Sequence, residues 1–175
     1  MKVAESILLS QYLDLKNKNW QKAGCGVVSL LMLMRCYPPS GSQPKRPLPD
    51  LNKLYQVGLN RRAYIKGVGW RHSGLVGLAK IYGFKKSRAY DLAKEEKAKA
   101  LSLLKEELKK GPVMASVFSK YEPGRAGHLV VLLSLTNTTA EVLDPDTEER
   151  HKIYQRLLAK KFLTAWKGRF IAVRP

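Results

Sequence analysis

The sequence predicts one α+β domain, in which helices come first and an antiparallel sheet follows. The chain has 175 residues, a length that suits one domain spanning residues 1–175. Apolar residues recur at helical spacing up to about residue 110, whereas short Val- and Leu-rich runs separated by turn residues follow. Helices followed by strands favour the α+β class over alternating βαβ units.

The clearest buried element is a predicted helix that begins at Cys25. Residues 25–34 carry no charge, and a helix that is apolar on all faces is a buried helix, so we expect it to run through the centre of the domain. Further helices are predicted at 49–59, 73–82 and 91–110, the last amphipathic with acids early and lysines late. The Pro-rich segment 38–49 predicts a surface loop.

The last third of the chain predicts the sheet. Strands are expected at residues 113–118, 128–135 and 140–143, which are rich in Val and Leu and bounded by Gly, Pro and Asn-Thr. A helix is expected at 154–166 and a closing strand at 169–173. The buried helix should therefore pack on a C-terminal antiparallel sheet.

Basic residues dominate the charge balance. Lys and Arg number 32 against 14 Asp and Glu, a formal net charge of +18. Such an excess suits nucleic acid, anionic lipid or an acidic peptide as partner. Because the bases are spread from Lys2 to Arg174 without a run longer than two, we expect a lysine-decorated surface and no stable nucleic-acid complex.

Targeting segments are not evident in the sequence. The start of the chain lacks the apolar run of ~7–15 residues of a signal peptide. The longest uncharged stretch, 23–34, is shorter than the ~20 residues that span a bilayer. We expect a soluble cytoplasmic protein, and export without a signal peptide stays compatible with the sequence.

The two cysteines predict separate roles. Eleven helical steps would put the Cα atoms of Cys25 and Cys36 ~16 Å apart, whereas a disulfide needs less than ~7 Å. We expect Cys36 to be buried and to pack as a small hydrophobic residue. No metal-ligand spacing and no phosphate-binding glycine loop occurs, so no cofactor or metal is expected.

Cys25 is the candidate nucleophile. It lies between Gly24 and Gly26 at the start of the buried helix, where free N–H groups and the helix dipole favour a thiolate. The glycines would let a substrate backbone come close. The alternative is a packed structural thiol.

His128 and Asp144 are the candidate partners of this thiol. A turn at Asn137-Thr138 would make an antiparallel hairpin that places residue 128 beside residue 144 or 145. Asp144 would then fix the His128 tautomer while the imidazole deprotonates Cys25. Each taken alone also suits a plainer role, His128 as a core histidine and Asp144 as a turn residue before Pro145.

An oxyanion hole would need hydrogen-bond donors near Cys25. Its own backbone N–H is one candidate, and the side-chain amides of Asn19 and Gln21 are two others. Asn19 or Gln21 could equally be an ordinary loop residue without a role in the site.

The remaining histidines and the tryptophans are weaker candidates. His72 suits a surface or capping role, although it could line a cleft, and His151 lies on a charged, solvated stretch. Trp20, Trp70 and Trp166 suit packing roles, with Trp20 and Trp70 also placed to wall a substrate groove.

Several ordered segments together resemble one family. These are NWQKAGCGVVSLLMLM, GWRHSGLVGLAKIYG, PVMASV, GHLVVLLSL, VLDPD and FLTAWKGRFIAV. The set, which covers nearly the whole chain, is similar to the papain-like cysteine peptidases of the bacteriocin-processing type. The resemblance implies a papain-like α+β fold and a Cys, His, Asp site at Cys25, His128 and Asp144. One position departs from the pattern, because the oxyanion glutamine six residues before the cysteine is Asn19 here and Gln21 is only four before.

The leading hypothesis is therefore a cysteine peptidase that cleaves peptide bonds in a peptide or protein substrate. One alternative is a catalytically idle peptide-binding domain of the same fold. A basic nucleic-acid-binding protein is the weaker alternative, suggested only by the charge.

Overall fold

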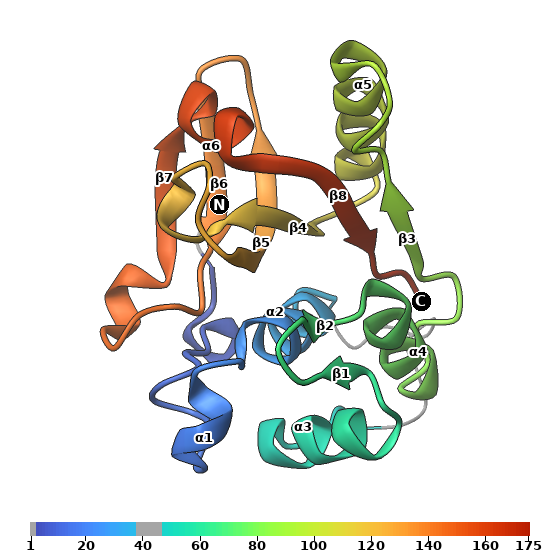
Figure 1. Ribbon diagram of the computed structural model, residues 1–175, viewed down its shortest axis with the longest axis vertical. Coiled ribbons are helices and arrows are strands. Elements are labelled where there is room, and N and C mark those ends of the chain that lie inside the picture. Colours follow the sequence, from blue (N-terminus) through green and yellow to red (C-terminus); the bar gives the residue numbers. More distant parts are fainter. Residues whose placement is uncertain (1–2, 38–46) are drawn as a thin grey trace.

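The computed structural model describes residues 3–37 and 47–175 of the chain (Figure 1). In chain order the elements are η1 Glu5–Ile7, α1 Lys18–Gln21, α2 Cys25–Arg35, α3 Leu51–Asn60, β1 Tyr64–Ile65, β2 Gly69–Trp70, α4 His72–Ile81, β3 Arg88–Asp91, α5 Lys97–Lys109, β4 Val113–Phe118, η2 Ser119–Tyr121, β5 Gly127–Leu135, β6 Thr139–Leu143, η3 Arg150–Lys152, β7 Tyr154–Leu158, α6 Ala159–Ala165 and β8 Trp166–Ala172.

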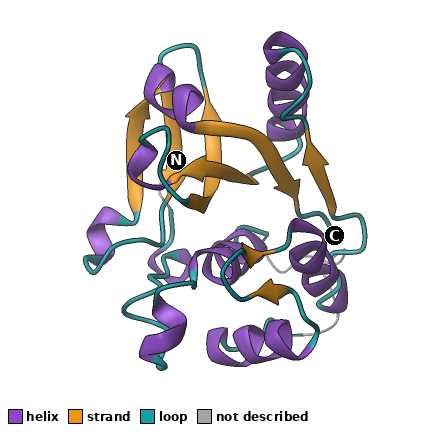
Figure 2. Cartoon of the chain, viewed as in Figure 1, coloured by secondary structure: helices purple, strands orange, loops and turns teal. Residues whose placement is uncertain are grey.

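The architecture is α+β, as the sequence predicts. Figure 1 shows α1 to α4 with the small β1–β2 sheet in one half of the molecule, and the large sheet with α5 and α6 in the other. Figure 2 shows the same separation, with helices α1 to α4 below the strands of the large sheet and α5 and α6 in the upper half beside them. The large sheet has six strands in the order β3-β8-β4-β5-β6-β7, and all neighbours are antiparallel.

Strand alternation gives the large sheet two buried faces. In β5, Leu129 and Val131 join a core that includes α2, α3 and α4, whereas Val130 and Leu132 join a second core that includes Phe162 of α6. Because successive side chains of a strand point to opposite faces, the continuously apolar sequence of β5 fits a strand covered on both sides. The sheet is therefore a middle layer.

α2 is the buried helix that the uncharged segment predicts. Every residue from Gly26 to Met34 is buried. The helix packs against β5 on one side and against α3 and α4 on the other. Its first residue is Cys25, so the position of that thiol is set by a helix enclosed in the core.

The predicted helix over residues 91–110 is wrong at its start. Residues 88–91 form β3, which pairs with β8, and helix α5 begins only at Lys97. Asp91 accepts a hydrogen bond from the Ala93 N–H and pairs with Arg169 at 2.9 Å, which closes a turn between strand and helix. The strand partner lies far along the sequence, so local spacing gave no sign of it.

The predicted helix over residues 154–166 is also partly wrong. Residues 154–158 form β7, which pairs with β6 along its full length, and only Ala159–Ala165 is helical. β8 starts at Trp166, three residues before the expected strand. Pairing with β6 supplies backbone hydrogen bonds that override the helical spacing of this segment.

The other predicted elements lie within a few residues of the observed ones. Strands β4, β5 and β6 and helices α3 and α4 agree with the sequence, whereas the short β1–β2 pair was not expected. Most of the predicted loop at 38–49 lies outside the described residues. None of the helices in the described part of the chain is long and apolar enough to cross a membrane.

Candidate active site

Cys25 is the first residue of α2, directly after the Gly24 N-cap, and it is half-buried. Packing within the protein gives the flanking glycines a reason that the sequence did not suggest. A Cβ on Gly24 would lie 2.5 Å from Leu15 Cδ1, and one on Gly26 would lie 2.7 Å from the Trp70 ring. Glycine is needed at both positions because Leu15 and Trp70 already fill the space that a Cβ would occupy.

Trp70 fixes the start of α2. Its Nε1 donates a hydrogen bond to the Ala23 carbonyl at 2.6 Å, two residues before Cys25. The indole also lies against Gly58 of α3, where a Cβ would come within 2.6 Å of the ring. One side chain therefore ties the turn before Cys25 to two helices.

His128 and Asp144 meet in the interior, with 6% and 5% of their surfaces exposed. His128 Nε2 and Asp144 Oδ1 are 2.7 Å apart. The expected strand register is wrong, because the ladder pairs Val131 with Leu143 and would thus put Asp144 opposite Val130. The contact is made along the diagonal, two residues away on β5.

Asp144 accepts two more hydrogen bonds. The Tyr121 hydroxyl donates to Oδ2 at 3.1 Å, and the Asp146 backbone N–H donates to Oδ1 at 3.0 Å. Tyr121 was not expected at the site. It lies in the short η2 turn, where Lys120 and Tyr121 have positive φ angles of 56° and 58°. Nothing in the local sequence signals that conformation.

The electrostatics of the pair favour an ion pair. Burial opposes charge on His128, but the hydrogen bond to Asp144 and the nearby Cys25 side chain outweigh it and raise the pKa of His128 well above its ordinary value. Burial likewise opposes charge on Asp144, yet its bond to His128 and its other donors lower the pKa of that carboxyl. With Nε2 on Asp144, Nδ1 is the ring nitrogen left for the thiol.

A cleft of about 520 Å³ opens over Cys25 and His128. It is lined by residues of α1–α2, the β1–β2 hairpin, α4 and the strands β4, β5 and β8, namely Lys22, Ala23, Cys25, Tyr64, Gly67, Val68, Gly69, Trp70, His72, Ser116, Gly127, His128, Leu129, Lys167 and Arg169. His72 thus lines the cleft and does not have the surface or capping role that was expected. Burial, then the nearby Arg169, lowers the pKa of His72, which keeps this ring neutral near pH 7.

Neither candidate oxyanion amide lines this cleft. Gln21 donates both amide hydrogens to backbone carbonyls, those of Tyr12 and Leu15, at 2.9 Å each. Its side chain therefore holds the preceding loop in place. Asn19 is exposed on α1, and its backbone N–H is capped by Asn17.

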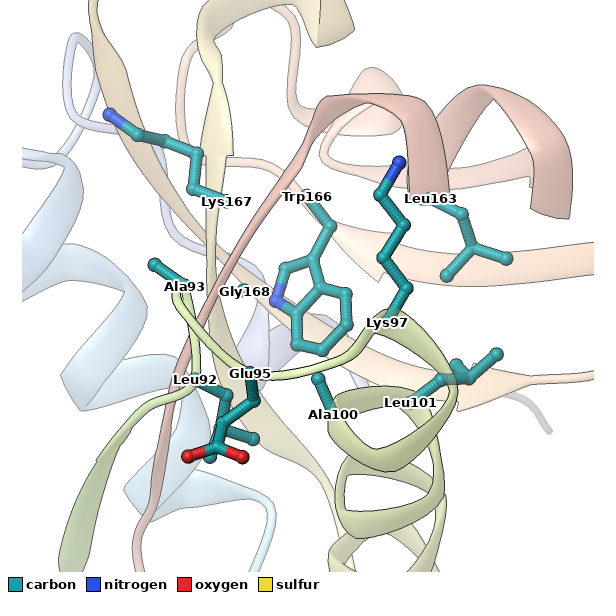
Figure 3. Close-up of a pocket in the computed structure, with 10 residues that line it drawn as sticks. All are labelled: Leu92, Ala93, Glu95, Lys97, Ala100, Leu101, Leu163, Trp166, Lys167 and Gly168. Carbon is teal, nitrogen blue, oxygen red and sulfur yellow. The ribbon is translucent and has the colours of Figure 1, made fainter.

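A second cavity of about 490 Å³ lies between α5, α6 and β8 (Figure 3). Its lining is mostly apolar and includes Leu92, Ala100, Leu101, Leu163 and the Trp166 indole. Lys167 lines both this cavity and the cleft over Cys25. The two hollows are therefore neighbours along β8.

The other sequence candidates lie away from this centre. The two cysteines are free, and burial raises the pKa of the Cys36 thiol to about 11. His151 is exposed beside Glu149, and Trp20 stacks on Tyr55. Within residues 3–37 and 47–175, no group of three or more His, Cys, Asp or Glu side chains is arranged to hold a metal ion.

Solved peptidase structures share this fold. A protein described as a C39-like peptidase from Bacillus anthracis matches with a TM-score of 0.63 and 18% identity, over 97% of this chain and 94% of that one. The peptidase domain of Streptococcus ComA, a bifunctional ABC transporter involved in a quorum-sensing pathway, matches with a TM-score of 0.60 and 19% identity, over 88% and 93%.

A third match is a double-glycine motif protease from an AMS/PCAT transporter in complex with the leader peptide. Its TM-score is 0.51 at 20% identity, over 86% of this chain and 84% of that one. No protein-family model and no curated protein matches the sequence. The chain therefore has the papain-like α+β fold of C39-like peptidase domains, which confirms the resemblance at the level of the fold.

Proposed function

We propose that the chain is a cysteine peptidase, with Cys25 as nucleophile, His128 as general base and acid, and Asp144 as the group that orients the imidazole. The observation that carries this proposal is that His128, hydrogen-bonded to the buried Asp144, lines the same cleft as Cys25. The peptidase fold supports it.

The reaction follows from these contacts. In its neutral form His128 takes the Cys25 proton, and the thiolate attacks the peptide carbonyl carbon to give a tetrahedral adduct. The adduct collapses when the imidazolium gives its proton to the leaving amine. Water, deprotonated by His128, then attacks the thioester, releases the carboxylic acid and restores the thiol.

The oxyanion of the adduct would be held by the backbone N–H of Cys25. As the first helical residue, Cys25 has no i−4 acceptor within α2. Asn19 is the candidate for a side-chain donor, because both amide hydrogens of Gln21 are already in use.

The proposed substrate is a peptide or an extended segment of a protein. One neighbour of the same fold is described in complex with a leader peptide. Here the cleft over Cys25 adjoins the apolar cavity through Lys167, which offers an extended peptide polar contacts beside the scissile bond and apolar contacts further away.

An activity probe tests the proposal. The full chain is treated with a peptidyl acyloxymethyl ketone, and the labelled residue is identified by mass spectrometry. We expect labelling of Cys25 in wild type and in Cys36→Ala, and none in Cys25→Ala or His128→Ala. If the folded, reduced chain stays unlabelled and cleaves no peptide of a diverse library, the proposal is wrong, and the result favours a catalytically idle peptide-binding domain.

A further inference from the structure

The ammonium of Lys167 stands at the His128 side of the cleft. Lys167 is half-buried on β8, and its Nζ lies 5.0 Å from the centre of the Phe118 ring. A Cβ on Gly127, the residue before His128, would lie 3.3 Å from this Nζ. In Figure 3 the side chain points away from the Trp166 indole and the apolar cavity. The aromatic face steadies the cation by a cation–π contact.

This charge has no acidic partner in the described part of the chain. No carboxylate there lies within 4.0 Å of Lys167 Nζ, whereas the neighbouring Arg169 is paired with Asp91 at 2.9 Å. The cleft lining contains Lys22, Lys167 and Arg169 but no Asp or Glu. Lys167 and Arg169 also both act to lower the pKa of His72. The cleft is thus positively charged, and the Lys167 ammonium is available to pair with an anion.

We propose that Lys167 selects peptides that carry an Asp or Glu side chain within two residues of the scissile bond. This inference rests on the proposed peptidase function and adds the substrate class. A carboxylate in the cleft would pair with an ammonium that is already partly desolvated and positioned, so little side-chain entropy is lost on binding. Lys22 is exposed and Arg169 is already paired. Both therefore add to the positive electrostatic potential of the cleft more than they contact the substrate carboxylate directly.

Matched peptides test the preference. A diverse library of peptides with amidated C-termini is digested by the full chain, and cleavage sites are read by mass spectrometry. Amidation leaves side chains as the only source of carboxylate. The best acidic peptide is then compared with the same peptide carrying Glu→Gln or Asp→Asn. We expect kcat/KM to favour the acidic peptide by about tenfold or more in wild type, and this ratio to fall to about one in Lys167→Gln.

Charge reversal and a matched lysine complete the design. Lys167→Glu should prefer a peptide with Lys at the same position. Lys160→Gln, which removes an exposed lysine of α6 that lines neither cavity, should keep the wild-type ratio. An unchanged ratio in Lys167→Gln, or no enrichment of acids around the cleavage sites, would overturn the inference.

A binding arm separates this inference from the proposed function. If wild type cleaves nothing, the peptidase proposal fails, and fluorescence anisotropy of labelled Glu and Gln peptides on Cys25→Ala decides the inference. Tighter binding of the Glu peptide that is lost in Cys25→Ala/Lys167→Gln supports the role of Lys167. Equal binding of both peptides refutes it.

Discussion

Ser29 donates a hydrogen bond to the backbone carbonyl of Leu129 at 2.8 Å, although the two residues lie 100 positions apart in the chain. Ser29 is one helical turn after Cys25, and Leu129 directly follows His128. Both residues are buried. This bond therefore fixes the distance between the helix that carries the thiol and the strand that carries the imidazole.

Ser29→Ala should lower both stability and turnover. The change removes a buried hydrogen bond, which costs about 1–3 kcal/mol in the free energy of unfolding, and it loosens the spacing of Cys25 and His128. Urea unfolding and kcat measure the two effects. Ser134→Ala is the control and should leave kcat near wild type. Ser134 lies further along β5, and its half-buried hydroxyl donates to Glu141 of β6. A stability loss with normal kcat would make Ser29 a purely structural residue.

Gly26→Ala should destabilise the chain by about 1–3 kcal/mol, because the new methyl group would overlap the Trp70 ring. Gly77→Ala is the matched control. Gly77 is also helical, but a Cβ there meets nothing within 4 Å, so alanine should stabilise the protein by about 0.5–1 kcal/mol. Thermal unfolding of the two variants checks the opposite signs. Equal stability would show that the indole moves freely.

These glycines show where sequence reasoning worked and where it failed. The uncharged run after Cys25 correctly predicted a buried helix, because burial on all faces leaves a local mark in composition. The purpose of Gly26 could not be predicted, because its neighbour Trp70 arrives from another part of the chain. For the same reason β7 was predicted as helix and β3 was not predicted, since their partners β6 and β8 decide their conformation.

The stability of the protein should fall as the pH rises above about 6.5, the ordinary pKa of an unfolded histidine. His128 has a raised pKa in the fold, so between the two values the native state holds a proton that the unfolded state has lost. The largest slope for one such group is about 1.4 kcal/mol per pH unit. Asp144→Asn removes the main charge partner and should flatten the slope.

Denaturant titrations between pH 6 and 9 measure this slope, and imidazole NMR reports the His128 titration directly. Glu106→Gln, which removes an exposed carboxylate paired with Lys109, serves as the charge control and should keep the wild-type slope. An identical slope in Asp144→Asn would mean that His128 does not carry the extra proton.

Tyr121→Phe should lower kcat about two- to tenfold and raise the pKa of the acidic limb of kcat/KM. Burial, then the Asp144 carboxylate, raises the pKa of Tyr121 far above its ordinary value, so the phenol stays protonated and donates to Asp144. Without that donor, Asp144 ionises less readily. The pH–rate profile separates this effect from general loosening. Tyr154→Phe, whose hydroxyl donates to Glu141, should leave the profile unchanged.

Asn19→Ala and Gln21→Ala should separate two roles. Loss of an oxyanion donor lowers kcat, here by about tenfold or more for Asn19→Ala. Gln21→Ala should instead lower the free energy of unfolding by about 1–3 kcal/mol, because two backbone carbonyls lose their donors. Burst kinetics with an ester substrate and urea unfolding check both. The opposite pattern would make Gln21 the donor.

The constellation of Cys25, His128 and Asp144 was accessible from sequence because each residue stands at the end of a recognisable element. Their spacing was not, since the predicted hairpin register was wrong and His128 meets Asp144 along the diagonal. Tyr121 and Lys167 escaped notice because an unusual turn and a long side chain bring them to the site, and neither leaves a periodic signal.

Ser29 and Leu129 lie 100 positions apart, so the two halves of the site are synthesised at different times. During synthesis the ribosome releases α2, with its thiol, long before the strand that carries His128 has been made. A nascent chain that ends at α5 thus holds the proposed nucleophile without the base that activates it. If the chain is the peptidase proposed here, its activity begins only when the sheet is complete, and the growing polypeptide is not cleaved by its own site.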